Sequence, residues 1–468
     1  MKDTKHQFKM FSFFDFDGIT AHMEKMAAQG WMLEQSTNRY WYYRRTEPKK
    51  LKFAVTYFPQ ASEFDPHPTE ELRAFNEFCQ AAGWKPAASM AQMQIYYNEN
   101  ENPIPLETDP MIQVNTIHKA MKKNFIPSSV LMMVISLMIL VMNAVKFFTD
   151  PVRSLSSNAD FFISFSYMML FLISAVELGQ YYRWRKKAME LASDGLPVPS
   201  GKTAKLFQII VLAVMSVMLV IYGALSLGVV SLWLLVVIFA IFGGTGVAAV
   251  WLKEFLRKKN VPRHMNMVLT FGIVITVSIF MMFMVVWAAV KYDLPTSPKE
   301  SKPVGSYTTP QGFEFDIYND EVPLRIEDFM HTDYSDYSVQ NRQSGSVLLS
   351  ISEVRQDATV NRQGVPEIIY EITKVKFRPV YNLCFEDIFY SLDDSKDKNV
   401  TDEYKAKLIE QSDPAWNADK VYRLQYLDEY EDKWLICWDD KIVEIRLYNC
   451  GQLTDSQKSV IAEKLINQ

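Results

Sequence analysis

Five apolar stretches of about twenty residues each occupy the middle of this 468-residue chain. The hydrocarbon core of a bilayer is about 30 Å thick, and a helix needs about 20 apolar residues to cross it. The sequence therefore predicts a transmembrane bundle of five helices, at residues 125–148, 161–180, 206–227, 229–252 and 267–290. An odd number of crossings places the two flanking soluble segments on opposite faces of the bilayer, a layout that can carry information across a membrane.

Basic residues gather at alternate ends of these stretches. They precede the first stretch and follow the second and the fourth: Lys119, Lys122, Lys123, Arg183, Arg185, Lys186, Lys187, Lys202, Lys205, Lys253, Arg257, Lys258, Lys259 and Arg263. Between the first and second stretches there is only Arg153. Because loops rich in Lys and Arg stay in the cytoplasm, the sequence predicts a multi-pass plasma-membrane protein with a cytoplasmic amino terminus and an extracytoplasmic carboxy terminus.

The second stretch decides on which side the chain ends. It is the shortest of the five and contains Glu177. If residues 161–180 do not cross, the carboxy-terminal segment is cytoplasmic. Glu177 and Lys146 are the ionisable residues within the predicted spans, which makes an ion path one interpretation. Both lie close to a predicted helix end, so we favour the interpretation that their side chains extend to the interface.

The charge of the chain differs between its regions. The net charge is zero for residues 1–124, +7 for residues 125–290 and −12 for residues 291–468. We interpret residues 1–124 as a cytoplasmic domain, the proline-containing residues 291–305 as an extended linker, and residues 306–468 as an extracytoplasmic α+β domain that can bury its own core. Its acidity suits capture of a cationic ligand or simply a solvated surface, and we favour the solvated surface.

The amino-terminal domain shows an alternating order of strands and helices. Strands are predicted at residues 8–14, 31–44 and 51–58, with one or two more at residues 84–97, and helices at residues 18–29 and 68–82. Each helix ends at a glycine followed by tryptophan, Gly30-Trp31 and Gly83-Trp84, so the second half echoes the first. The order β-α-β-β-α-β predicts a ferredoxin-like α+β fold, with both helices on one face of a four-stranded antiparallel sheet.

Some residues of this domain also carry a family resemblance. Phe11–Phe14 with Asp15 and Asp17, the Gly30-Trp31 helix end, the Tyr42-Tyr43 strand and Lys52–Pro59 resemble the amino-terminal domain of the bacterial family called domain of unknown function 2812. This resemblance covers about the first hundred residues. It implies a membrane-anchored member in a regulatory setting, since such proteins are often encoded beside PadR-type transcriptional regulators, and it supplies no catalytic residues.

Two short motifs mimic loops of known enzymes. Asp15-Phe16-Asp17-Gly18 resembles the nucleophile loop of haloacid-dehalogenase phosphatases, in which the first Asp attacks phosphorus. The domain is too small for the sheet and partner residues of that chemistry, so we interpret Asp17 as the cap of a helix that begins at Gly18. Ser200-Gly201-Lys202-Thr203 ends like a phosphate-binding loop, but Leu196 stands where that loop requires glycine.

The sequence predicts no catalytic, cofactor-binding or metal-binding residues. The histidines form no ligand cluster: His6, His22, His67, His118, His264 and His331. The methionines of the spans have no nearby Cys or His with which to hold Cu(I), so we interpret them as packing residues. Cys79, Cys384, Cys437 and Cys450 are expected to be buried thiols, and whether Cys437 pairs with Cys450 stays open.

The carboxy-terminal domain is predicted to mix strands and helices. Strands are expected at residues 313–318, 346–354, 368–377, 420–427, 433–438 and 442–448, and the last three form a meander. Helices are expected at residues 381–392, 402–411 and 454–466, the last capped by Thr454. This domain would fold as an α+β unit outside the membrane.

These features favour a non-catalytic envelope sensor or regulatory protein. The outer domain would bind an unknown ligand, and the inner domain would bind a cytoplasmic protein such as a transcriptional regulator, with no direct nucleic acid binding. The helices would contact the lipid bilayer. One alternative is a subunit of a membrane transporter or exporter. Another is a membrane-anchored phosphatase that uses Asp15 and Asp17, although the sequence predicts no enzyme.

Overall fold

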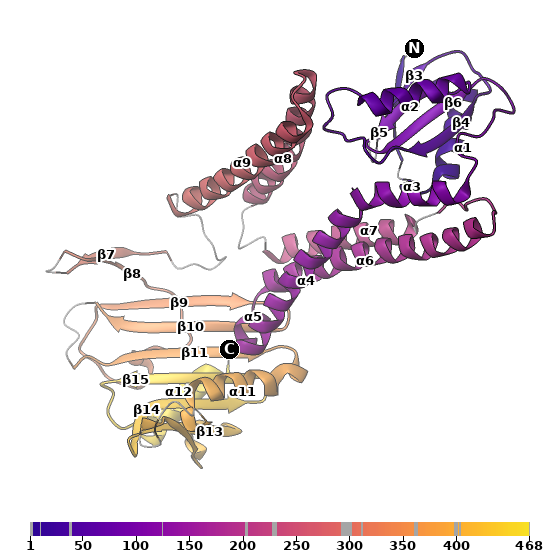
Figure 1. Ribbon diagram of the computed structural model, residues 1–468. Helices are drawn as coiled ribbons and strands as arrows, with labels where there is room; N and C mark the ends of the chain where they lie inside the picture. Colours follow the sequence, from indigo (N-terminus) through magenta and orange to yellow (C-terminus); the bar gives the residue numbers. More distant parts are fainter. Residues whose placement is uncertain are drawn as a thin grey trace. The chain divides into compact units, whose positions relative to one another are not determined.

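The computed structural model describes residues 3–9, 11–36, 40–123, 125–201, 205–226, 232–291, 302–309, 312–359, 364–396, 401 and 404–467 (Figure 1). It divides into two compact units that alternate along the chain. One contains Met1–Ile139, Ser166–Val217 and Val236–Val290, and the other contains Leu140–Phe165, Met218–Leu235 and Lys291–Gln468. Each soluble domain therefore shares a unit with part of the helical region.

The amino-terminal domain consists of two successive β-α-β-β motifs. In each motif the third strand pairs antiparallel with both others, which gives the strand orders β1-β3-β2 and β4-β6-β5. The elements are β1 (Thr4–Phe8), α1 (Phe16–Ala28), β2 (Trp31–Ser36), β3 (Tyr40–Arg45), β4 (Lys52–Tyr57), α2 (Glu70–Ala81), β5 (Lys85–Met90) and β6 (Met93–Asn98). The predicted single four-stranded sheet is wrong, because two three-stranded sheets take its place.

An internal repeat explains this difference. An offset of 53 residues relates Gly30 to Gly83, Trp31 to Trp84, and β3 to β6. Both glycines follow a helix with positive φ, +77° and +85°, a conformation that favours glycine. The first motif has the split β-α-β order of a ferredoxin-like fold, but residues 31–44 hold two strands instead of one. The next strand, β4, then begins a second motif instead of joining β1.

One hydrophobic core joins this domain to two helices that follow it. Helix α3 (Pro110–Lys123) contributes Val114, Ile117, Ala120 and Met121, and helix α6 (Asn158–Ser193) contributes Tyr181, Trp184, Ala188 and Ala192. Both sets recur every three or four residues, which is the spacing of one helix face. The folded amino-terminal domain is therefore larger than its β-α-β-β motifs and is packed against the cytoplasmic end predicted for the second span.

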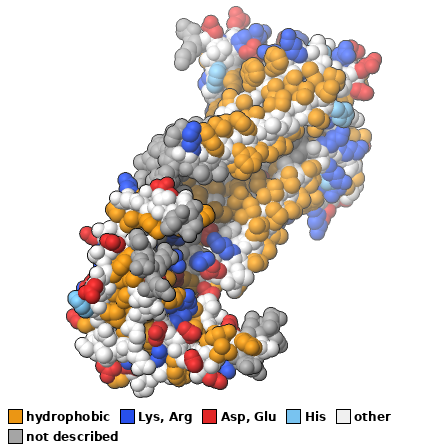
Figure 2. Space-filling model, turned by 90° about the vertical axis from the view of Figure 1, so that its left-hand side faces the viewer, with side chains coloured by type: hydrophobic (Ala, Val, Ile, Leu, Met, Phe, Trp, Pro, Cys, Tyr) orange, Lys and Arg blue, Asp and Glu red, His pale blue; other side chains and the backbone are white. Residues whose placement is uncertain are grey.

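The middle of the chain is helical. It contains α4 (Phe125–Thr149), α5 (Pro151–Leu155), α6, α7 (Lys205–Ser226), α8 (Leu232–Lys258) and α9 (Arg263–Lys291). Among the described residues, Phe125–Thr149, Asn158–Ser193 and Arg263–Val285 are long and apolar enough to cross a membrane. Exposed hydrophobic side chains cover these helices, and Figure 2 shows such side chains gathered over the helical part of one face. The predicted turn at Gly228 lies outside the described residues.

The basic segment after the second predicted span is helical, and its interpretation as a loop is wrong. Arg183, Arg185, Lys186 and Lys187 lie on α6, which continues to Ser193. The helix continues because Tyr181 and the following buried residues cover one face, while the basic side chains lie on the more exposed face. The same residues that indicate membrane topology thus form one side of an amphipathic helix.

The carboxy-terminal domain is built on a seven-stranded antiparallel sheet with the order β12-β13-β14-β15-β11-β10-β9. A separate hairpin pairs β7 (Gly305–Thr308) with β8 (Glu314–Ile317). The sheet strands are β9 (Tyr337–Gly345), β10 (Leu349–Ala358), β11 (Glu367–Val375), β12 (Lys407–Glu410), β13 (Lys420–Tyr426), β14 (Glu429–Trp438) and β15 (Lys441–Tyr448). The helices are α10 (Ile326–Phe329), α11 (Tyr381–Leu392) and α12 (Asp455–Ile466), with short 3-10 turns at Arg378–Val380, Asp394–Lys396 and Pro414–Trp416.

Helices cover both faces of this sheet. Side chains alternate along β14, so that Trp434, Ile436 and Trp438 join one core with α10 and α12, whereas Leu435 and Cys437 join the other core with α5 and α11. Cys437 and Cys450 belong to different cores, and all four cysteines are free and buried. The pairing of Cys437 with Cys450 that the sequence left open therefore does not form.

Most predicted elements of this domain are confirmed. The predicted helix at residues 402–411 is wrong, because its described part contains the edge strand β12. Strands β7 and β9 and helix α10 were not predicted. Residues 292–301 of the expected linker lie outside the described residues, and β7 begins at Gly305. The meander β13-β14-β15 and the helices α11 and α12 agree with the sequence.

Candidate functional site

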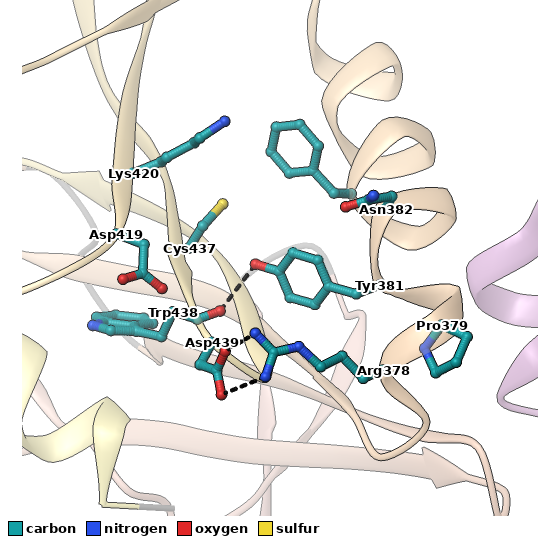
Figure 3. Close-up of a pocket in the computed structure, with 10 residues that line it drawn as sticks. Arg378, Pro379, Tyr381, Asn382, Asp419, Lys420, Cys437, Trp438 and Asp439 are labelled. Atoms are coloured by element: carbon teal, nitrogen blue, oxygen red, sulfur yellow. Dashed lines mark hydrogen bonds and ion pairs between the residues drawn. The ribbon is translucent and has the colours of Figure 1, made fainter.

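A pocket of about 470 Å³ opens in the carboxy-terminal domain between α11 and the sheet (Figure 3). Tyr381 and Asn382 project from the helix, and Asp419, Lys420 and Cys437 lie opposite them on the sheet side. The full lining is Arg378, Pro379, Tyr381, Asn382, Phe385, Asp419, Lys420, Cys437, Trp438 and Asp439. This volume is in the range of small-molecule sites.

The charged groups of the pocket fall into two kinds. Arg378 and Asp439 form an ion pair, with 2.5 Å between Nη2 and Oδ1. Asp419 and Lys420 have no ion-pair partner among the residues that the structure describes. The Lys420 ammonium lies 5.9 Å from the centroid of the Phe385 ring, close enough for a cation–π contact. One carboxylate and one ammonium therefore remain available to a ligand.

The inner wall of the pocket is uncharged. The Tyr381 hydroxyl donates a hydrogen bond of 2.9 Å to the Trp438 carbonyl oxygen. Burial raises the pKa of Tyr381 and is also the main reason why the pKa of Cys437 rises to about 12. A thiol of that pKa stays protonated at neutral pH, so Cys437 does not have the character of a reactive thiolate. The chemistry of this wall suits binding and not nucleophilic catalysis.

Helix α11 connects the pocket to α5, the short helix between α4 and α6. Its first turns carry Tyr381 and Phe385, and its Asp387 carboxylate accepts a hydrogen bond of 3.2 Å from the Val152 amide. Val152 and Leu155 are buried in the core beneath α11. The Ser346 hydroxyl also donates to the Leu155 carbonyl oxygen. The segment between the first two predicted spans is therefore an integral part of the carboxy-terminal domain.

A row of three glutamates crosses the sheet face on which α5 and α11 pack. Glu353, Glu371 and Glu444 are directly opposite one another on β10, β11 and β15. Lys433 pairs with Glu444 at 2.8 Å. Burial raises the pKa of Glu371, and the charges of Glu444 and Glu353 raise it further, with Arg153 of α5 opposing them. Like charges directly opposite on neighbouring strands oppose folding.

A second contact region lies in the amino-terminal domain, around Asp15. The Asp15 side chain is 2% exposed and accepts a hydrogen bond of 3.1 Å from the Gly18 amide. The Ser200 hydroxyl donates to the same carboxylate at 3.3 Å and accepts from the Asp17 amide at 3.1 Å. The N-cap of α1 is therefore Asp15, and the prediction that Asp17 caps a helix from Gly18 is wrong by two residues. The cap fits here because its carboxylate reaches the third helical amide.

Close packing fixes the segment after α6 against this cap. The Gly201 amide donates to the Phe14 carbonyl oxygen at 3.0 Å, and the Phe14 ring stacks on Trp184 with 4.8 Å between centroids. A Cβ atom on Gly201 would lie 2.0 Å from a Phe14 ring carbon. Only glycine fits this approach. Lys202 and Thr203, which complete the phosphate-loop mimic, lie outside the described residues.

The end of α8 and the start of α9 contact the same domain. Lys253 pairs with Glu63 at 3.1 Å, and Arg263 donates to the Gln60 carbonyl oxygen at 3.0 Å. Asn266 is fully buried and donates to the carbonyl oxygens of Phe64 and Lys253 at 3.4 and 3.3 Å. The amino-terminal domain thus contacts the ends of α6 and α8, which carry basic residues, together with Ser200, Gly201 and the first turn of α9.

The other predicted residues of interest serve as local contacts. Lys146 pairs with Asp160 at 2.5 Å between the end of α4 and the start of α6, and Glu177 lies within α6. His118 forms a hydrogen bond of 2.6 Å with the Tyr181 hydroxyl, and His22 forms one of 3.1 Å with the Tyr43 hydroxyl. Within the described ranges, no group of three His, Cys, Asp or Glu side chains could hold a metal ion.

The family resemblance of the first domain is confirmed. Residues 15–128 match the protein family described as Protein of unknown function (DUF2812). The chain carries a DUF2812 domain. The match begins at the N-cap Asp15 and ends in the first turn of α4, so the DUF2812 domain includes α3 and extends past residue 124. Comparisons with curated proteins and with solved structures found no match for this chain.

Sequence reasoning missed the pocket and the α5 contact for different reasons. The pocket joins residues 378–385, 419–420 and 437–439, and only the folded sheet brings these segments together. Helix α5 did have a local signal. Asp150 caps it through the Arg153 amide, and Pro151 occupies its first turn, a common pattern at helix starts.

Proposed function

We propose that this protein is a plasma-membrane signalling protein without catalytic activity. In this proposal the carboxy-terminal domain lies outside the cell and responds to a ligand. The DUF2812 domain lies in the cytoplasm and passes the change to a protein partner, such as a transcriptional regulator. All five apolar helices cross the bilayer between them.

The observation that carries this proposal is the continuity of α6. This helix has 36 residues, which corresponds to a length of about 54 Å, against about 30 Å for a bilayer core. At its start, the Asn158 amide group donates to the Gly345 carbonyl oxygen, and Phe161 packs on the core of the carboxy-terminal domain. At its end, Tyr181 and Trp184 are buried in the core of the DUF2812 domain. One continuous helix therefore contributes residues to the packing of both soluble domains.

The contacts of the connecting segments support the two-sided topology. The carboxy-terminal domain holds α5, which connects α4 to α6. The DUF2812 domain contacts the ends of α6 and α8, Ser200 and the first turn of α9. Five crossing helices would place these two sets of segments on opposite faces of the membrane. The basic residues lie on the DUF2812 set, which agrees with a cytoplasmic position for that domain.

Signalling of this kind needs two states of the protein that differ in ligand affinity, because a ligand that binds both states equally shifts nothing. We propose that the two states differ in how α5 is held against the sheet. A change at α5 moves the start of α6, and the rigid helix carries this movement to its cytoplasmic end. The surface around Asp15 and Ser200 would change with it.

Amide hydrogen exchange of the full chain in lipid nanodiscs tests this coupling. The variant Asp387→Ala removes the acceptor of the Val152 amide. We expect faster exchange in residues 151–165 and also in residues 11–18 and 181–201 of the other unit. The matched control is Glu386→Ala, an exposed neighbour on α11, which should leave both regions unchanged. Faster exchange confined to the carboxy-terminal unit would contradict the proposed coupling.

A further inference from the structure

We infer that the pocket beside α11 binds a zwitterion with an apolar side chain, that is, a free amino acid or a short peptide with an aromatic or aliphatic residue. The binding itself follows from the lining of the pocket. Its consequence for signalling rests on the proposed function.

The charged side chains of the lining indicate a ligand with one positive and one negative group. Two basic and two acidic side chains line the pocket, and Arg378 and Asp439 neutralise each other. Asp419 and Lys420 have no ion-pair partner in the part of the chain that the structure describes. A purely anionic or purely cationic ligand would satisfy only one of these two. A ligand with both an ammonium and a carboxylate group can pair with each, through charge-assisted hydrogen bonds.

The uncharged wall indicates that the ligand also has an apolar side chain. Tyr381, Phe385 and Pro379 present rings and aliphatic carbon from the helix side. The raised pKa values of Tyr381 and Cys437 keep the hydroxyl and the thiol neutral, so they offer no charge to a ligand. Apolar surface next to one carboxylate and one ammonium matches an amino acid whose side chain packs on the aromatic residues. Asn382 adds an exposed amide that can pair with a peptide group.

The position of the pocket connects ligand binding to α5. A ligand against Tyr381 and Phe385 contacts the first half of α11, and Asp387 in the same helix holds the Val152 amide of α5. Ligand binding therefore stabilises α11, the helix that holds α5. We expect a bound ligand to slow amide exchange in residues 381–392 and 151–155.

Calorimetric titration of the full chain in nanodiscs tests the binding. The probes are alanyl-phenylalanine, its N-acetyl form, which lacks the ammonium group, and its amide form, which lacks the carboxylate. We expect the unprotected peptide to bind most tightly, with a loss of about three- to tenfold for each blocked form, as partly exposed ion pairs allow. Equal affinity for all three probes, or no binding of any at millimolar concentration, would overturn the inference.

Two variants assign the charges. In Asp419→Asn, acetylation of the peptide should no longer weaken binding, whereas amidation should still do so. In Lys420→Met the pattern should be reversed. Glu386→Gln, on α11 but outside the lining, is the control and should bind like the parent protein. Thermal unfolding of each variant checks its folding, and the comparison of probes on the parent protein needs no variant at all.

The outcomes separate the two proposals. Peptide binding without any change of exchange in residues 11–18 would support the pocket and count against the signalling role. A response of residues 11–18 to Asp387→Ala, with no peptide binding, would support the signalling role and overturn the ligand assignment.

Discussion

Glu371 lies between Glu353 and Glu444 on the sheet face that α5 covers, and this position makes it costly to ionise. Its pKa is raised by burial and then by the charges of Glu444 and Glu353, while Arg153 acts in the opposite direction. Lys433 pairs with Glu444 and leaves Glu371 without a comparable partner among the described side chains. We therefore expect this single residue to make the stability of the carboxy-terminal domain depend on pH.

The sign of this dependence follows from linkage. A carboxyl group whose pKa is higher in the folded than in the unfolded state opposes folding when ionised. The penalty is absent below the unfolded pKa, grows as the pH rises through the folded pKa, and is complete above it. We expect Glu371→Gln to raise the unfolding temperature at neutral pH and to change it little in acid.

Differential scanning calorimetry across a pH series measures this effect. Glu429→Gln, at the exposed start of β14, serves as the control and should not change the shape of the pH profile. An unfolding temperature of Glu371→Gln below that of the parent protein at neutral pH would show that the carboxylate is stabilising, contrary to the prediction.

At the scale of elements, the sequence predicted those helices and strands whose conformation depends on nearby residues. The bounds of α11, Tyr381–Leu392, agree with the expected helix, and Thr454 caps α12 through a capping box. Strand β12 was expected as a helix because it is an edge strand of four residues that pairs with β13 alone. Its conformation depends on that partner, and short segments of this kind carry little periodicity of their own.

The end of α6 that packs on the DUF2812 domain shows the opposite case. This segment was interpreted as a loop because it is rich in basic residues, although Trp184, Ala188 and Ala192 have helical spacing. The pocket residues had no such signal, since they come from three separate segments. The family match itself depends on the first domain, whose glycine and aromatic positions are local features of the sequence.

A proline substitution tests whether the end of α6 needs to be helical. Lys187 is exposed on α6 between buried residues, so Lys187→Pro removes a helix hydrogen bond without touching the core directly. We expect a loss of about 3 kcal/mol or more in the stability of the DUF2812 domain, measured by chemical unfolding of the chain in nanodiscs. Lys187→Ala, which keeps the helix, should have almost no effect. Equal stability of both variants would show that the segment does not need to be helical.

At the scale of the whole molecule, the number of crossings decides the proposed role. Three helices in the described part of the chain are long and apolar enough to cross a membrane, and α7 and α8 supply the other two crossings that we propose. Five crossings would separate the DUF2812 domain from the carboxy-terminal domain. Four would place both on the same side of the membrane and remove the basis for a transmembrane signal.

Protease treatment of intact spheroplasts, with a tag at each end of the chain, measures this directly. We expect digestion of residues 306–468 together with protection of the amino-terminal tag. Digestion of both domains after the membrane is permeabilised serves as the control for protease access. Protection of both ends in intact spheroplasts would indicate an even number of crossings and would rule out the proposed signalling role.

The burial of α5 has a consequence for how the protein is made. Val152 and Leu155 are 5% and 3% exposed within a core whose other members lie between Leu349 and Ile442. Residues 306–468 thus form one core of their own beneath α10 and α12, whereas the core beneath α11 also includes α5. During synthesis α5 leaves the ribosome about two hundred residues before the strands that cover it, so the carboxy-terminal domain acquires its native packing only after α6 to α9 have been made. Until then, the domain is incompletely packed and open to quality-control proteases. Residues 306–468 produced alone would lack Val152 and Leu155, which would leave the core beneath α11 incomplete.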